Sequence, residues 1–158
     1  VVMIQRAVWV HGTSVRAERP EALAREERMG WGSSFYLKPG TDTWFHVSIP
    51  TPVIIKQTAE ADKVFILFRT TKTPTTFSGS VIGAVHVYDG AHRVRTLDGS
   101  RSGSHEKAID TENTWTIDPP LVIHSGLGLS INASMPQVLG EASEAVFFST
   151  VGADFSAG

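Results

Sequence analysis

Alternation of apolar and polar residues is the feature that most limits what this chain can fold into. In "DTWFHVSIP", residues 42–50, and "SVIGAVHVYDG", residues 80–90, apolar residues recur at every second position. Successive side chains of a β-strand point to opposite faces, so this period of two predicts strands with one buried face. The same segments are rich in Val, Ile, Thr, Phe and Trp, which favour strands. The chain is therefore predicted to be all-β.

Further strands are expected from comparable patterns along the chain. They fall in residues 6–18, 31–38, 63–71, 92–99, 113–120, 121–135 and 145–155. The nearly continuous apolar run "KVFILFRTT", residues 63–71, predicts a central strand covered on both faces. About nine strands with turn signals at short spacing predict an antiparallel β-sandwich of jelly-roll type. The 158 residues are expected to form a single domain, 1–158.

Two polar segments depart from this pattern. "PEALAREERMG", residues 20–30, starts with a proline, contains good helix formers and ends with a glycine, which predicts a short surface helix or a charged loop. "DGSRSGSHEKAIDTEN", residues 98–113, is the longest polar stretch. Long loops in compact domains are commonly mobile or functional, so this segment is predicted to be a mobile loop or a binding loop.

Composition excludes several classes of function. The net charge of −2 gives no basic field for nucleic acid or an anionic membrane, so neither is predicted as a partner. The absence of cysteine excludes disulfides, thiol nucleophiles and thiolate metal sites, and it fits a cytoplasmic or an exported protein equally. No apolar run approaches the roughly 20 residues of a membrane span, and no signal peptide is predicted at the start.

The histidines His86 and His92 flank the pair Asp89-Gly90, which is a strong signal for a hairpin. A two-residue turn at Asp89-Gly90 would place the two imidazoles on opposite faces, whereas a three-residue loop would pair them. The three-residue register would bury two arginines on the core face at a large cost. We therefore predict the two-residue turn and no shared metal at this pair.

Histidines elsewhere leave a metal-dependent or acid–base enzyme open as a third hypothesis. His11, His46 and His124 are each embedded in apolar sequence, but no H-x-H, H-x-x-x-H or H-E-x-x-H spacing supports ligation. A core or rim histidine with one hydrogen-bond partner is the simpler interpretation. No cofactor is predicted, although calcium held by loop carbonyls would leave no trace in the sequence.

Hydrolase chemistry fits the sequence poorly. There is no G-x-S-x-G motif, His11 and Ser14 face opposite sides of an expected strand, and so do His124 and Ser125. A triad assembled from separate strands stays open. Most acidic residues lie in expected turns; Asp154 lies near an apolar strand, and a terminal turn or an edge is the simpler explanation for it.

Aromatic residues near strand ends and turns give the most open functional prediction. They are Trp31, Tyr36, Trp44, Tyr88 and Trp115. In residues 42–50, Trp44, His46 and Ser48 share one face, whereas Phe45, Val47 and Ile49 form the core face. A mixed aromatic and polar face is unusual for plain solvent exposure, so the Trp44/His46 face is predicted to be a binding surface or a subunit interface. Pro50 and Pro52 then break ladder pairing.

Five segments together resemble a family of small bacterial all-β proteins to which no function is assigned. They are "AVWVHGTSV", "GWGSSF", "TWFHVSIPTPVI", "VHVYDGAHRV" and "VFFSTVGADF", and the block around "WFHVSIPTP" is the most specific. The resemblance spans most of the chain and implies one complete β-sandwich domain. It implies no activity and supplies no site residues.

The first functional hypothesis is a non-catalytic, lectin-like module that binds a glycan or another small molecule. Its expected ligand-binding residues are Trp44, His46, Trp31 and Tyr36, with the loop 98–113 as another location. The alternative is a structural β-sandwich that assembles into a homo-oligomer through the Trp44/His46 face. The second alternative is the small metal-dependent or acid–base enzyme.

Overall fold

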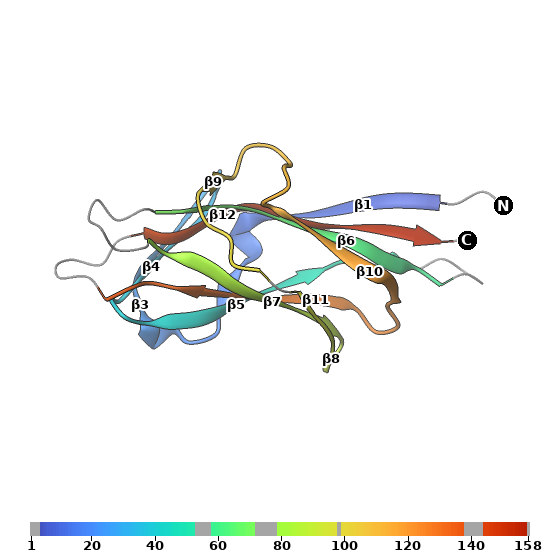
Figure 1. Cartoon of the computed structure of the whole chain (residues 1–158), viewed down its shortest axis with the longest axis horizontal. Coiled ribbons are helices and arrows are strands. Elements are labelled where there is room, and N and C mark those ends of the chain that lie inside the picture. Colours follow the sequence, from blue (N-terminus) through green and yellow to red (C-terminus); the bar gives the residue numbers. More distant parts are fainter. Residues whose placement is uncertain (1–3, 53–57, 72–78, 98, 138–143, 158) are drawn as a thin grey trace.

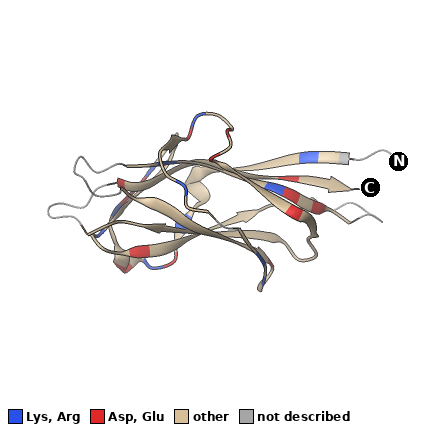
Figure 2. Cartoon of the chain, viewed as in Figure 1, with Lys and Arg blue, Asp and Glu red and all other residues tan. Residues whose placement is uncertain are grey.

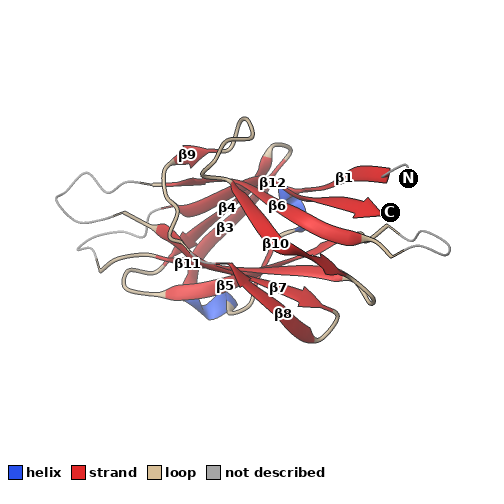
Figure 3. Ribbon diagram, turned by 45° about the vertical axis from the view of Figure 1, so that its right-hand side comes forward, coloured by secondary structure: helices blue, strands red, loops and turns tan. Residues whose placement is uncertain are grey.

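The computed structural model describes residues 4–52, 58–71, 79–97, 99–137 and 144–157. Within these residues, twelve strands form two antiparallel sheets that pack face to face as a sandwich (Figure 3). The predicted all-β sandwich is confirmed, with twelve strands in place of about nine. No helix in the described part of the chain is long and apolar enough to cross a membrane.

The larger sheet has seven strands within the described residues. It contains β1 (Ile4–His11), β3 (Leu23–Met29), β4 (Gly32–Leu37), β6 (Glu60–Thr70), β9 (Ser104–His105), β10 (Thr114–Val122) and β12 (Glu144–Ala157). The long strand β12 pairs with β6 along one side, and with β4 and then β1 along the other. Because β1 pairs with β12 over its full length, the first and last described strands lie side by side (Figure 1).

The smaller sheet has five strands in the order β2-β5-β11-β7-β8, counted over the described residues. Their bounds are β2 (Arg16–Ala17), β5 (Asp42–Ile49), β11 (Leu127–Ser134), β7 (Val81–Asp89) and β8 (His92–Leu97). Three central strands, β5, β11 and β7, pair without interruption over residues 127–132 of β11. Because the pairing is uninterrupted, it fixes which side chains of β5, β11 and β7 are neighbours on the outer face of the sheet.

The core lies between the two sheets and is built around three aromatic rings. The Phe35 and Phe45 ring centroids lie 4.6 Å apart, and Phe148 lies 5.6 Å from Phe45 and 6.0 Å from Phe35. Strand β6 lies between β10 and β12, and its residues 64–68 are all buried. The prediction of a central strand covered on both faces is therefore confirmed.

The expected first strand, residues 6–18, is interrupted. β1 ends at His11, and the short 3-10 helix η1 (Gly12–Ser14) carries the chain from the larger sheet to β2 in the smaller one. The Nδ1 atom of His11 accepts the backbone N–H of Thr13 at 3.2 Å, which stabilises this crossing. The core-facing positions change phase at the crossing, since Val8 and Val10 contact the core before it and Val15 and Ala17 contact the core after it.

The prediction of a helix or a loop over residues 20–30 holds for the first three residues and is wrong for residues 23–29, which form a strand. A 3-10 helix η2 (Pro20–Ala22) leads into the edge strand β3, which pairs with β4. β3 is mostly exposed, and its charges pair along the strand, Arg25 with Glu27 at 3.1 Å and Arg28 with Glu26 at 3.2 Å. Because neither face of β3 is buried, its sequence shows no apolar alternation. The extended conformation of β3 follows from its pairing with β4. Charges on an edge also discourage pairing with other chains.

Within the predicted loop 98–113, residue 98 lies outside the described residues, and the rest is held by internal contacts. The segment Ser104–His105 forms β9 beside β6. The fully buried Asn113 side chain donates to the carbonyl oxygens of His105 at 2.9 Å and Ala108 at 2.8 Å. Ser149 Oγ donates to the carbonyl of Glu106 at 2.8 Å, which fastens the loop over the larger sheet.

The hairpin of β7 and β8 turns one residue later than predicted. Asp89 pairs with His92, so Gly90 and Ala91 form the turn, and Gly90 has a φ of 59°. A bulge follows, so Val87 pairs with Arg95 and Val94 is exposed, in place of the predicted core position. The guanidinium of Arg95 is satisfied because it donates to the carbonyl oxygens of Asp118 and Pro119. His86 and His92 lie on opposite faces, as predicted.

The boundary between β10 and β11 also shifts. β10 continues past Pro119 and Pro120 to Val122, with a change of register after Thr116. Residues 123–126 then form the turn into β11, where Gly126 has a φ of 149°. The predicted strand 121–135 is therefore two strands, and Gly126 lies in the connection between them.

Candidate binding face

The outer face of the five-stranded sheet presents one row of side chains across all five strands. Arg16 of β2 pairs with His46 of β5, His46 with Ser130 of β11, Ser130 with His86 of β7, and His86 with Thr96 of β8. Cross-strand partners share a face, so these groups lie side by side. We call the outer surface around this row the binding face. The predicted division of β5 into a Trp44/His46/Ser48 face and a core face is confirmed.

Two rings meet above β11. The ring centroids of Trp44 and His86 lie 4.4 Å apart at an angle of 37°. They come from β5 and β7, which lie on either side of β11, so the pair spans the strand between them. Ser130 of β11 is only 7% exposed, although it points away from the core. The packed rings rigidify this part of the face.

A shallow groove opens beside this ring pair. Gly128 lies two residues before Ser130 on the same face, between Ser48 of β5 and Tyr88 of β7. With no side chain at Gly128, the space between its neighbours stays open. The groove has a volume of about 700 Å³, and its lining residues include Arg16, His46, Ser48, Tyr88, Gly128 and Ser130. An apolar ring and several polar groups thus border one depression.

His46 is hydrogen-bonded through both ring nitrogens. Its Nε2 lies 3.1 Å from Glu18 Oε1, and its Nδ1 lies 2.8 Å from Ser130 Oγ. A carboxylate only accepts hydrogen bonds, so in the neutral imidazole Nε2 carries the proton. Nδ1 then accepts the hydroxyl proton of Ser130. Glu18 follows β2, and its backbone N–H donates to the Trp44 carbonyl at 2.8 Å, which fixes it beside β5.

His86, on the other side of Ser130, is kept neutral. Burial lowers its pKa below the ordinary value, and the positive charge of Arg93 lowers it further. Arg93 pairs with Tyr88 and therefore shares the binding face. A neutral imidazole offers one donor and one acceptor, so His86 adds hydrogen-bonding capacity without charge.

The four predicted ligand-binding residues fall in two separate places. Trp44 and His46 lie on the binding face. Trp31, which is 69% exposed, lies in the turn between β3 and β4, and Tyr36 lies on β4, both in the other sheet. The guanidinium of Arg25 stacks on the Tyr36 ring at 4.1 Å. Of the other aromatic candidates, Tyr88 joins the binding face, whereas Trp115 is buried in the core.

The three histidines proposed for a metal centre are not brought together. His11 ends β1 and contacts Thr13, His46 lies on the binding face, and His124 lies in the connection before β11. Among the described residues, no group of three or more His, Asp or Glu side chains is arranged to hold a metal ion.

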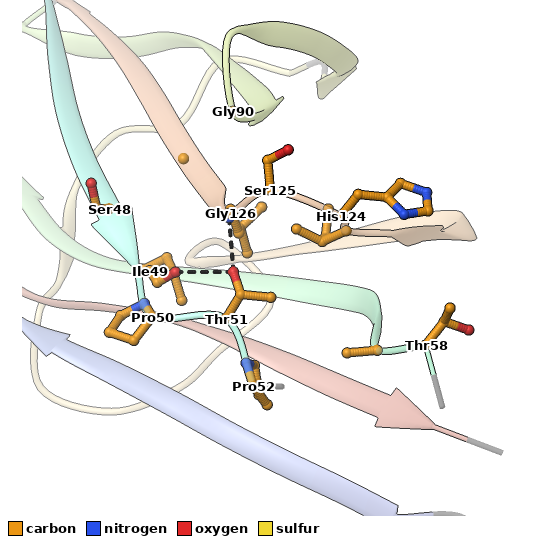
Figure 4. Close-up of a pocket in the computed structure, with 14 residues that line it drawn as sticks. Ser48, Ile49, Pro50, Thr51, Pro52, Thr58, Gly90, His124, Ser125 and Gly126 are labelled. Carbon is orange, nitrogen blue, oxygen red and sulfur yellow. Dashed lines mark hydrogen bonds between the residues drawn. The ribbon is translucent and has the colours of Figure 1, made fainter. Parts of the chain in front are cut away.

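His124 borders a second depression at one end of the sandwich (Figure 4). There, Thr51 Oγ accepts the backbone N–H of Leu127 at 2.9 Å and thus ties β5 to β11. The side chains of His124 and Ser125 point in different directions, as Figure 4 shows. These contacts are structural, and the polar groups do not converge on one point.

Asp154 lies inside a strand, contrary to the expected turn or edge. It is part of β12 and pairs with Ala7 of β1 and Lys63 of β6. Burial raises its pKa, the charge of Asp62 raises it further, and Lys63 opposes both. The charged residues of β12 are the acidic Glu144 and Asp154, whereas β3 and β6 carry charges of both signs (Figure 2).

Sequence reasoning missed Arg16, Glu18, Ser130 and Gly128 as members of the face. His46 and Ser130 are 84 residues apart and His46 and Glu18 are 28 apart, so no local motif connects them. The alternation within each strand indicates that Glu18, His46 and Ser130 point away from the core. The strand order and register that bring them together are set by pairing across the sheet.

Comparison with known proteins assigns a family and no activity. No curated protein matches the chain at a significant level. Residues 3–158 match the family described as "Family of unknown function (DUF6623)". Because this match covers nearly the whole chain, the protein belongs to that family.

Proposed function

We propose that the protein is a binding module that holds a carbohydrate on the binding face. The observation that carries this proposal is the groove at Gly128, where the Tyr88 ring lies beside the hydrogen-bonding groups of His46, Ser48 and Ser130. A sugar ring offers an apolar face of C–H groups and a rim of hydroxyls. Small-molecule sites combine apolar and aromatic surface with a few placed polar groups in the same way.

Charge and rigidity support this choice of ligand. Arg16 and Arg93 lie on two sides of the face, while Glu18 is paired with His46. Hydroxyl groups suit such a mixed array because they both donate and accept. The ring pair of Trp44 and His86 and the bonds of His46 hold the face in one arrangement, so little ordering is needed on binding.

The test is a glycan array probed with the full chain, the Tyr88→Ala variant and the Tyr36→Ala variant. Tyr36 is the matched control because it is a half-buried tyrosine on β4, in the other sheet. The proposal predicts binding by the wild type and by Tyr36→Ala, and loss of binding by Tyr88→Ala, because the Tyr88 ring lines the groove. Thermal unfolding must show that Tyr88→Ala is folded. Binding that survives in folded Tyr88→Ala would contradict the proposal.

A second candidate uses the same surface for self-assembly. The half-buried rings of Trp44 and Tyr88 would then pack against another copy of the chain. A blank array combined with a sedimentation coefficient that rises with protein concentration would favour this candidate. In that case, Trp44→Ala should remain monomeric at concentrations where the wild type associates.

A further inference from the structure

The hydrogen-bonded series Glu18–His46–Ser130 has the arrangement of an activated nucleophile. A hydroxyl lies 2.8 Å from an imidazole nitrogen, and the other nitrogen of the same ring lies 3.1 Å from a carboxylate oxygen. Nucleophile, base and orienting carboxylate within hydrogen-bond reach are the features by which such centres are recognised, whatever their order in the sequence. Simple carbohydrate binding does not require this series.

The protonation pattern suits a base at His46. Glu18 fixes the proton on Nε2, so the lone pair of Nδ1 is directed at the Ser130 hydroxyl. After proton transfer, the imidazolium would donate from Nε2 to the Glu18 carboxylate, which stabilises the positive charge. Glu18 is therefore a positioning residue, because it acts through His46.

The open side of Ser130 is the groove. Ser130 is nearly buried, with His46 and His86 as its cross-strand neighbours, yet it is one of the residues that line the groove. Gly128, two positions before it on the same face, has no side chain to block an approach. Arg16 is a basic residue lining the same groove and supplies positive charge for an oxyanion.

We propose that Ser130 is an acyl-accepting nucleophile, with His46 as its general base, toward esters of small carboxylic acids. Ser130 Oγ bonds to the ester carbonyl carbon, and its proton passes to His46 Nδ1. The bond from that carbon to the alcohol oxygen breaks, and the alcohol leaves with the proton. Water then adds to the acyl-serine, which releases the carboxylic acid and restores the Ser130 hydroxyl.

The substrate class rests on the proposed function, because an O-acylated carbohydrate is the ester that a sugar-binding face would present. The nucleophile itself does not depend on that proposal. Any small ester or phosphonyl fluoride that enters the groove should react with Ser130.

The test uses an alkyl fluorophosphonate and p-nitrophenyl acetate with the full chain. The fluorophosphonate should form an Oγ–phosphorus bond with loss of fluoride, and mass spectrometry should locate the adduct on Ser130. Ser130→Ala should carry no adduct at that position. Ser156→Ala is the matched control, since Ser156 lies on β12 in the other sheet, and its labelling should equal that of the wild type.

His46→Gln keeps a polar side chain of similar reach and should react at least about 100-fold more slowly, the usual contribution of a general base. Glu18→Gln should slow labelling less than His46→Gln does, and it should lower kcat toward p-nitrophenyl acetate while leaving KM unchanged. A purely structural role of Glu18 would not give this split between kcat and KM.

No adduct on Ser130 of the folded wild type, or equal labelling of His46→Gln, would overturn this inference. Glycan binding without an adduct would overturn the proposal of a Ser130 nucleophile and would still support the proposal of a carbohydrate-binding face. An adduct with a blank array would support the nucleophile and contradict the carbohydrate ligand.

Discussion

Asp89 holds Ser125 through a hydrogen bond of 2.7 Å from the backbone N–H of Ser125 to Oδ1. The same carboxylate accepts the N–H groups of His124 at 2.9 Å and Gly126 at 3.1 Å. Asp89 ends β7, so one buried side chain organises the connection between β10 and β11. Burial opposes its ionisation, but the three backbone donors outweigh burial and hold its pKa below the ordinary value.

Replacing Asp89 with Asn should lower the free energy of unfolding by about 2–4 kcal/mol at neutral pH, because an amide cannot accept all three donors. A carboxyl group with a depressed pKa stabilises the fold above its unfolded pKa of about 3.9, and this contribution is lost as the pH falls through the folded value. The difference between wild type and variant should therefore shrink in acid. Urea unfolding from acid to neutral pH measures this difference in unfolding free energy, and Asp118→Asn, at an exposed carboxylate, is the control. A difference that does not depend on pH would contradict the assignment.

His105 should stabilise the loop in its charged form. Its Nδ1 lies 2.7 Å from Asp110 Oδ2 and its Nε2 lies 3.0 Å from the Ser102 carbonyl, so an imidazolium satisfies both acceptors. Burial lowers its pKa, but the bonds and charge of Asp110 outweigh burial, and the pKa is raised overall.

The stability that protonated His105 adds to the fold is fully present below the unfolded pKa of about 6.5. It is lost as the pH rises through the pKa of His105 in the folded protein. An NMR titration should give His105 a pKa above the ordinary value of about 6.5. In His105→Gln, the loss of stability relative to wild type should be larger below pH 6.5 than above the folded value. A pKa for His105 at or below about 6.5 would contradict the structure.

Gly12 should be irreplaceable at the crossing between the sheets. A Cβ there would lie 2.0 Å from the carbonyl oxygen of Phe148 and 2.9 Å from that of Ser149, and backbone atoms cannot move aside. Gly12→Ala should lower the free energy of unfolding by about 3 kcal/mol or more. A Cβ at Gly30 meets nothing within 4 Å, so Gly30→Ala should stay within about 0.5 kcal/mol of wild type. Equal stability of the two variants in denaturant unfolding would contradict this account.

Gly128 should be replaceable without loss of the fold. Its Cβ would approach Tyr88 Cβ at 3.7 Å, an ordinary contact, and its φ is not in the left-handed region. Gly128→Val is therefore expected to fold with a stability within about 1 kcal/mol of wild type, since valine favours strands. Its side chain would fill the groove and should weaken glycan binding at least about 10-fold, measured by titration calorimetry. Unchanged affinity in this variant would place the ligand elsewhere.

Alternation predicted the faces of individual strands well. In β5, Trp44, His46 and Ser48 point outward, and Phe45, Val47 and Ile49 point into the core, because one face of that strand is buried. The same reasoning failed for β3, where Arg25 and Glu27 are paired with each other and neither face is buried. It also missed the break near Gly12, where the core-facing positions shift by one residue between Val10 and Val15.

The candidate site was predictable only in part for a related reason. Trp44 and His46 stand out within one segment, whereas Ser130 and Glu18 gain their significance from the order β2-β5-β11. Conversely, Trp31 and Tyr36 resemble the site residues in type, but β4 belongs to the other sheet. A local pattern gives the direction of a side chain, and only the pairing of distant strands gives its neighbours.

The most direct test of the binding face is a ¹H–¹⁵N NMR titration of the full chain with the glycan that binds best on the array. Saturable shifts should concentrate at His46, Tyr88, Gly128 and Ser130 and should be absent in Gly128→Val. Shifts that concentrate around Trp31 and Tyr36, or no shifts on the outer face of the five-stranded sheet, would contradict the proposed binding face.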